Sequence, residues 1–353
     1  MTTPAPDPVK NPLRDSTFLR ACRGETTDHV PLWFMRQAGR SLPEYRAVRE
    51  GTAMLESCFK PDMVVEITMQ PVRRYGVDAA IFFSDIVVPL KAIGVDLDIV
   101  AGTGPVVADP IRSREQLEQL RPVEDSDVEP ITQAVKALVG ELGSTPLIGF
   151  AGAPFTLASY LVEGGPSKDH LATKRLMYSD PDLWHDLAGR LAVIAGGFLR
   201  QQVLAGASAI QLFDSWTGAL SLADYQEFVA PHSAAALAAV EDLDVPRIHF
   251  GVGTGELLGA MGDVGADVVG VDWRVPLDEA VKRIAPGKAV QGNLDPAFLF
   301  TPEEVYTRRA AQIIEAGRAA NGHVFNLGHG VPPSTDPDAL KRLTDFVHGY
   351  ERV

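Results

Sequence analysis

Residues 31–40 read PLWFMRQAGR, an apolar run that leads directly into two arginines four positions apart. Residues 30–35 have the length and composition of a buried strand, and the small residues that follow are typical of a turn. The end of this strand would bring Arg36 and Arg40 together. Two guanidiniums, each able to bind carboxylate or phosphate through paired N–H groups, indicate a site for a multiply anionic ligand. The alternative is a surface pair bonded to nearby acids such as Glu44.

Seven further apolar runs follow along the chain. They lie at residues 79–83, 146–152, 208–216, 246–253, 267–274, 289–296 and 323–330. Eight buried strands that alternate with helical patterns predict parallel pairing and a closed (β/α)₈ barrel of the TIM type. The competing fold is an open, doubly wound sheet, which carries a nucleotide fingerprint on its first strand-to-helix turn. The corresponding turn here is RQAGR, so the sequence favours the α/β barrel.

The predicted barrel forms a single domain, residues 11–353. The polar, proline-rich residues 1–10 are predicted to be a disordered tail. Residues 90–122 interrupt the alternation of strands and helices. The alternating pattern VDLDIV and two nearby glycines predict a hairpin or a flexible arm there.

Charge and composition limit the partners of this chain. The net charge is −14 over 353 residues, which argues against nucleic acid and anionic membranes as partners, because both require a basic surface. A charged leader and a long apolar stretch are both absent from the sequence, so we expect a cytoplasmic protein. Cys22 and Cys58 lie outside any C-x-x-C or Cys/His pattern and are predicted to be structural thiols in a reducing compartment.

In such barrels the chemistry lies at the carboxyl ends of the strands. The polar residues predicted there are Arg36, Gln37, Arg40, Asp85, Tyr160, Asp214, Ser215, Asn293, Asp295 and His329. Asp85 is the most informative, because a carboxylate after an apolar strand is costly to ionise unless donors or a cation accompany it. Its alternative role is to cap the next element or to pair with an arginine.

Other polar residues are less specific when taken singly. No G-x-S-x-G motif surrounds Ser215, so the sequence does not indicate a serine hydrolase. His329 lies in the exposed, flexible setting GHG, which favours a functional role, whereas His249 is expected to be buried and satisfied within a strand. Asp214 is predicted to orient an arginine.

Two long motifs, PLWFMRQAGR at 31–40 and GFAGAPFTLASYLVEG at 149–164, resemble the paired signatures of the uroporphyrinogen decarboxylase family. FFSDI, FDSW and GHG also fall where that family has them, so the resemblance spans essentially the whole chain. It implies a distorted single-domain barrel, usually a homodimer, that acts in the cytoplasm. The implied reaction removes four acetate carboxyls from uroporphyrinogen III in haem and chlorophyll synthesis, without cofactor or metal.

The resemblance also implies which residues contact the substrate. These are Arg36, Gln37, Ala38, Gly39, Arg40, Asp85, Tyr160, Ser215 and His329, with Asp85, Arg36 and Tyr160 as the catalytic group. A pyrrole protonated on carbon can accept the electrons released with CO₂, so the protein must stabilise a cation. Asp85 suits this role, and the arginines would hold carboxylates. One arginine could also deliver the proton, although a guanidinium is a very poor acid and water could serve instead.

Two other functions remain open on the sequence. The barrel also resembles that of corrinoid-linked methyltransferases, which bind zinc through thiolate-rich sites near the mouth. Cys22 and Cys58 precede the predicted mouth positions, so such ligands are not expected here. The other function is that of a non-enzymatic tetrapyrrole carrier, which would have little need for an unpaired Asp85.

Overall fold

The computed structural model describes residues 13–350. The predicted tail, residues 1–10, lies outside this range. One curled sheet of parallel strands forms the centre, and its strand order is β1-β4-β5-β6-β7-β8-β9. The strands are β1 (Ala80–Ile81), β4 (Leu147–Gly152), β5 (Ala209–Asp214), β6 (Arg247–Gly251), β7 (Val268–Gly270), β8 (Ala289–Gln291) and β9 (His323–Val324). Consecutive neighbours in an all-parallel order are typical of a β/α barrel, as the sequence predicted.

The first apolar run takes the remaining position in the barrel, but not as a regular strand. Only Leu32 forms a bridge, which is parallel and pairs with Phe325 beyond β9. On its other side, the Leu32 carbonyl accepts a hydrogen bond of 2.9 Å from the N–H of Asp78, just before β1. The run therefore lies between the last and first strands. Pro31 has no N–H, and the N–H of Met35 donates to Asn326 Oδ1, so the predicted ladder over 30–35 does not extend.

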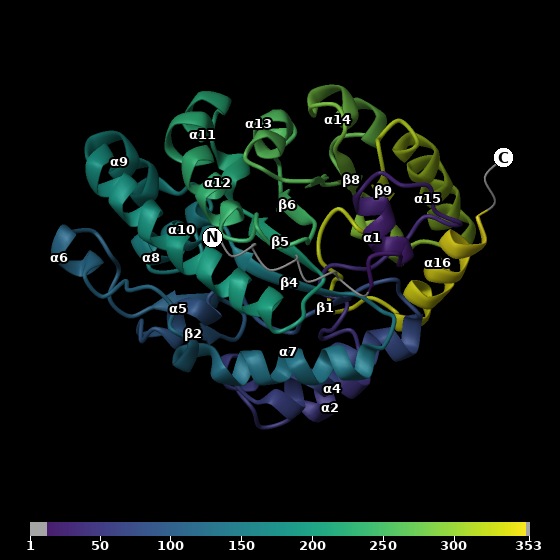
Figure 1. Cartoon of the computed structure of the whole chain (residues 1–353), viewed down its shortest axis with the longest axis horizontal. Coiled ribbons are helices and arrows are strands. Elements are labelled where there is room, and N and C mark those ends of the chain that lie inside the picture. Colours follow the sequence, from purple (N-terminus) through teal and green to yellow (C-terminus); the bar gives the residue numbers. More distant parts are fainter. Residues whose placement is uncertain (1–12, 351–353) are drawn as a thin grey trace, which may run out of the picture.

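Helices surround the curled sheet, and Figure 1 shows α4 and α7 along one edge and α9 to α16 around the rest. The helices that cover the barrel are α1 (Thr17–Cys22), α2 (Pro43–Val48), α3 (Met54–Cys58), α4 (Pro61–Tyr75), α7 (Glu129–Leu142), α8 (Pro154–Glu163), α9 (Leu171–Ser179), α10 (Pro181–Leu204), α11 (Leu222–Phe228), α12 (Ala230–Ala238), α13 (Leu258–Asp263), α14 (Leu277–Arg283), α15 (Glu303–Gly317) and α16 (Pro337–Gly349). Within the described range, none is long and apolar enough to cross a membrane.

Local signals in the sequence explain where the longer helices begin and end. Asp180 caps α10 by accepting from the N–H of Leu183, and Pro181 occupies the first turn, where its missing N–H costs nothing. Gly76 ends α4 in the left-handed conformation with φ of 70°.

The excursion at 90–122 contains a hairpin, as predicted. β2 (Leu97–Val100) pairs antiparallel with β3 (Gly104–Val107), and α5 (Val88–Ala92) and α6 (Arg114–Leu117) flank the pair. The N–H of Val107 donates to Gly164 and that of Ile111 to Leu161, so backbone hydrogen bonds fasten the hairpin to the end of α8. The excursion is therefore an attached support for α8 and not a free arm.

Within the barrel, a buried chain of polar side chains ties the first run to the opposite strands. Trp33 Nε1 donates to Gln291 Oε1 of β8 over 2.9 Å, and Gln291 Nε2 donates to Gln211 Oε1 of β5 over 2.9 Å. All three side chains are buried. Because buried polar groups are costly unless paired, this chain fixes the position of the run that ends at Arg36.

Candidate active site

Arg36 leaves the first run in an unusual backbone conformation. Its φ is +59°, a left-handed value that few residues other than glycine adopt and that often marks a ligand site. The stem of Arg36 passes close to Gly330, where an added Cβ would lie 2.6 Å from Arg36 Cδ. The backbone of Gly330 thus leaves room for Arg36, and the residue remains exposed.

Arg36 and Arg40 make no ion pair or side-chain hydrogen bond with any other described residue. The acid expected to bind them in the alternative interpretation, Glu44, instead pairs with Arg74 at 3.1 Å. Arg40 contributes only its backbone carbonyl, which accepts from Arg46 Nη1 at 2.6 Å. Two exposed guanidiniums in a strongly acidic protein without acidic partners are available for an anionic ligand.

Asp85 follows β1 at its carboxyl end and precedes α5. Its Oδ1 accepts a hydrogen bond of 3.1 Å from the N–H of Val87, the residue before α5, but no side chain caps the helix itself, so the alternative role as a helix cap was wrong. Burial raises the pKa of Asp85, while the N–H of Val87 and then the charge of Arg36 lower it. Part of the side chain keeps solvent contact. Asp85 therefore combines a turn contact before α5 with a position in the electrostatic field of Arg36.

Tyr160 and His329 complete the group around Arg36. Burial, followed by the nearby Asp85 charge, raises the pKa of Tyr160 to about 12, so its phenol keeps its proton at neutral pH. The Tyr160 ring lies against Trp216, with centroids 4.0 Å apart. Burial and then the charge of Arg36 lower the pKa of His329, which favours its neutral form. Arg36 therefore lies within electrostatic range of Asp85, Tyr160 and His329.

The other residues predicted to contact the substrate differ in how far they are buried. Gln37 is fully buried, where Oε1 accepts from the N–H of Phe34 and Nε2 donates to the carbonyl of Ala79. Ala38 and Gly39 are half-buried in the turn, and Ser215 is half-buried directly after β5. No direct interaction links Arg40 or Ser215 to the four grouped side chains in the described chain.

Asp214 corrects one prediction, because it does not orient an arginine. It is fully buried and accepts from Thr156 Oγ1 at 2.9 Å, and its Oδ2 lies 3.7 Å from His249 Nε2. His249 is buried, as expected, and its Nδ1 lies 3.2 Å from the carbonyl of Met261. Its Nε2 has no hydrogen-bond partner, so the expectation of a fully satisfied histidine was wrong.

Three neighbours of the site were missed from the sequence. Gly330 accommodates Arg36, Trp216 stacks on Tyr160, and Thr156 bonds Asp214. The second glycine of GHG and the tryptophan of FDSW were visible signals, since both stand at carboxyl ends of strands. Thr156 lies within the quoted motif 149–164, but the motif does not show that it bonds Asp214, because that partner is distant along the chain.

A separate cavity opens beside this group, at the carboxyl end of β8. It has a volume of about 370 Å³ and is lined by Trp273, Asn293, Asp295, Phe298, Val305, Arg308, Arg309 and Gln312. Two residues predicted at the mouth, Asn293 and Asp295, therefore face this cavity. Trp273 lies edge-on to His329, with ring centroids 6.4 Å apart, and so stands next to the grouped residues. The lining includes neither Arg36 nor Asp85, so this cavity is distinct from the surroundings of Arg36.

Within the described chain, neither cysteine belongs to a group of side chains that could hold a metal ion. Cys22 in α1 and Cys58 in α3 are both buried free thiols, and burial raises the pKa of each. Contrary to the sequence-based expectation, Cys58 lies beside Asp85, whose backbone N–H it contacts. A single protonated thiol there is not a zinc-binding set.

The curled sheet of parallel strands, completed by the first run at Leu32, and the polar groups at the carboxyl ends of the strands place this chain in the class of β/α barrels. A family model described as uroporphyrinogen decarboxylase (URO-D) matches residues 13–350. The chain belongs to the uroporphyrinogen decarboxylase family.

Individual relatives agree with this assignment. The uroporphyrinogen decarboxylase of Streptomyces avermitilis is 66% identical over 334 residues, which cover 95% of this chain and 94% of the relative. That of Nocardioides sp. is 65% identical over 347 residues, which cover 98% and 99%. Among solved structures, a methyltransferase from Methanosarcina mazei superimposes with a TM-score of 0.76 at 19% identity, over 94% of this chain and 97% of that one. This last similarity shows a shared fold.

Proposed function

We propose that this chain removes the carboxyl groups of the four acetate side chains of uroporphyrinogen III, giving coproporphyrinogen III and four CO₂. Membership of the family supports the reaction, and identities of 63–66% along nearly the whole chain support the substrate class. The observation that carries the proposal is the placement of the unpaired Arg36 beside the partly enclosed Asp85. One cation would bind a substrate carboxylate while one anion faces the ring.

Asp85 would act on the positive charge that develops during the reaction. Protonation of a pyrrole carbon makes a cation that accepts the electron pair of the breaking C–C bond, so CO₂ leaves without an external electron acceptor. A carboxylate held in place by the N–H of Val87 stabilises that cation without rearranging. Pyrrole N–H groups would in turn supply the donors that a buried carboxylate needs.

The other side chains would bind and orient the carboxylates of the substrate. Arg36 and Arg40 offer paired N–H donors, and Tyr160 keeps a phenolic proton to donate because its pKa is about 12. Ser215 and His329 would bond to further carboxylates, and the turn of Gln37, Ala38 and Gly39 would approach the substrate through its backbone. A guanidinium is a very poor acid, so we assign proton delivery to water held near Arg36.

Asp85→Asn tests the central role. We expect the variant to bind substrate and to lose turnover by about 10²-fold, because it removes one electrostatic stabiliser of the transition state. The assay is anaerobic and follows the number of carboxyl groups per tetrapyrrole.

The matched control is Asp336→Asn. Asp336 also accepts from an N–H two residues ahead, that of Asp338, but it caps α16 and pairs with Arg342, and none of the interactions of Arg36, Asp85, Tyr160 or His329 in the described chain involves it. The control should keep full turnover. Near-normal turnover of Asp85→Asn, with the control also active, would contradict the role of Asp85.

The two alternative functions would give different results from the proposed decarboxylation in activity assays. A zinc-dependent methyltransferase of the same barrel type would need thiolate ligands at the mouth, whereas Cys58 is the lone thiol near Asp85 among the described residues. Transfer of a methyl group from a corrinoid without CO₂ release would support that function. A tetrapyrrole carrier would bind the macrocycle and release no CO₂ at all.

We further propose that the chain acts as a homodimer in the cytoplasm, as the family resemblance implies. Analytical ultracentrifugation of the full chain should give twice the mass of 38.0 kDa. A single species at the monomer mass across micromolar concentrations would contradict the dimer without affecting the proposed reaction.

A further inference from the structure

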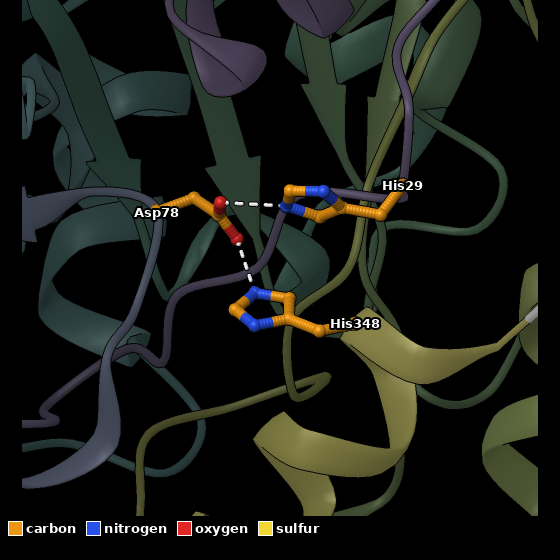
Figure 2. Close-up of side chains that lie close together, drawn as sticks. All are labelled: His29, Asp78 and His348. Carbon is orange, nitrogen blue, oxygen red and sulfur yellow. Dashed lines mark hydrogen bonds and ion pairs between the residues drawn. The ribbon is translucent and has the colours of Figure 1, made fainter.

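Three side chains from distant parts of the sequence converge on the barrel face opposite the candidate active site. His29 precedes the first run, Asp78 precedes β1, and His348 lies in the last turn of α16 (Figure 2). His29 Nε2 lies 2.8 Å from Asp78 Oδ1, and His348 Nε2 lies 2.8 Å from Asp78 Oδ2. Both ring nitrogens therefore point at one carboxylate.

We propose that His29, Asp78 and His348 form a binding site for a divalent transition-metal ion of the zinc type. Two imidazole nitrogens and one carboxylate are a common ligand set for such ions, with further positions left for water. Their ligand atoms all lie within 4.8 Å of one another. Ligands bonded to one zinc ion at about 2.0–2.2 Å lie roughly 3 Å apart, so only small shifts of the rings would admit the ion.

The surroundings of the three residues suit a metal ion. Asp78 Oδ2 also accepts from the N–H of Leu32 at 2.8 Å, an outer contact of the kind that orients a metal-binding carboxylate. The side chains of His29, Asp78 and His348 are 28%, 13% and 30% exposed, so an ion can reach them from solvent. Asp28, beside His29, adds further negative charge.

The histidines can release their Nε2 atoms for coordination. Neither Nδ1 makes a hydrogen bond in the part of the chain that the structure describes. Each ring can therefore carry its proton on Nδ1 while Nε2 donates its lone pair to the ion, and an imidazolium would release one proton to solvent.

The position of the site gives the ion a structural role. His29 lies seven positions before Arg36, and Asp78 lies seven positions before Asp85, so the two segments that carry the candidate catalytic groups begin at this cluster. An ion bound there would join both segments to α16 where the barrel closes. An ion that binds only the folded state raises the melting temperature as its concentration increases.

The test uses the full chain after treatment with a chelator. Zinc chloride titrated at pH 7.5 should bind at one ion per chain by calorimetry, and the melting temperature should rise with zinc. His348→Gln should weaken zinc binding by at least 10-fold and abolish the melting shift. Cobalt(II) should give visible absorption bands that His348→Gln removes.

A second histidine pair provides the matched control. His185 Nδ1 lies 2.9 Å from His232 Nε2, and no carboxylate joins that pair among the metal-ligating groups of the described chain. His185→Gln should leave zinc and cobalt binding unchanged. Equal zinc affinity of the unaltered chain and His348→Gln, or no binding by the unaltered chain, would overturn the proposal. If the circular dichroism of His348→Gln shows misfolding, the test rests on the cobalt spectrum of the unaltered chain. Strong visible bands would support the metal site, and only the weak bands of cobalt(II) in water would overturn it.

Discussion

At the scale of single residues, Asp85 is subject to two opposing effects: burial disfavours its carboxylate form, and nearby groups favour it. A carboxylate is stabilised there by the N–H of Val87 and the charge of Arg36, but burial has the larger effect and raises its pKa. A group whose folded pKa is raised stabilises the fold only when protonated, and this contribution is lost as the pH rises through the folded pKa. The carboxylate form of Asp85 is therefore a cost to the stability of the fold.

This opposition predicts that Asp85→Asn is more stable than the unaltered chain at pH 7. The amide is neutral and its oxygen can still accept from Val87, so the substitution removes the larger cost of burying the charge together with the smaller attraction to Arg36. The melting temperature should rise at pH 7, and the difference should shrink at a pH where Asp85 is protonated in both states. A lower melting temperature of the variant at pH 7 would contradict this assignment of the pKa shift.

The arginines at the mouth illustrate what a sequence shows about single residues. The spacing of Arg36 and Arg40 after an apolar run left a surface ion pair open, and an anion site was predicted only with the rest of the chain, because strand ends of a barrel meet at one face. It did not show that Gly330 must be without a side chain beside Arg36, since the two are separated by almost the whole chain.

At the scale of elements, α10 and α12 pack so closely that adjacent glycines in α10 have different roles. A Cβ on Gly196 would lie 2.6 Å from the Cβ of Ala239 and 3.1 Å from the carbonyl of Ala236. A Cβ on Gly197 would meet nothing within 4 Å. The two positions have the same helical propensity but opposite environments.

We therefore expect opposite effects from the same substitution. Gly197→Ala should stabilise the protein by about 0.5–1 kcal/mol, because alanine loses less conformational freedom in a helix. Gly196→Ala should destabilise it by about 1–3 kcal/mol through overpacking against α12. Urea unfolding of both variants measures the difference, and equal effects would show that the contact between α10 and α12 is loose.

At the scale of the whole molecule, the barrel closes with side chains as well as with strands. The first run has one bridge, at Leu32, and is held further by the chain from Trp33 through Gln291 to Gln211. Next to it, His323 of β9 is buried with Nε2 2.9 Å from the carbonyl of Gly292. The closing region therefore depends on buried polar groups that keep one protonation state.

His323 should make the barrel sensitive to acid. Burial lowers the pKa of His323 to about 4, against the hydrogen bond to Gly292, which raises it. A histidine with a depressed folded pKa stabilises the fold above its unfolded pKa of about 6.5, and this stability is lost as the pH falls towards 4, by up to about 1.4 kcal/mol per pH unit.

His323→Gln isolates this contribution. The variant should be less stable at pH 7, and its free energy of unfolding in urea should fall less steeply between pH 6.5 and pH 4.5. Gly197→Ala, which alters no titrating group, serves as the control with an unchanged slope. An identical slope in His323→Gln and the control would exclude His323 as a source of acid sensitivity.

The sequence by itself determined the barrel, the placement of seven of its strands and the family, because apolar periodicity and contiguous motifs are local properties of the chain. Only the tertiary structure decided that the first run closes the ring through a single bridge. It also decided that Asp214 meets Thr156 and that His29, Asp78 and His348 share one corner. These contacts join residues that are far apart in sequence, and their free energy depends on burial and distance, which exist only after folding.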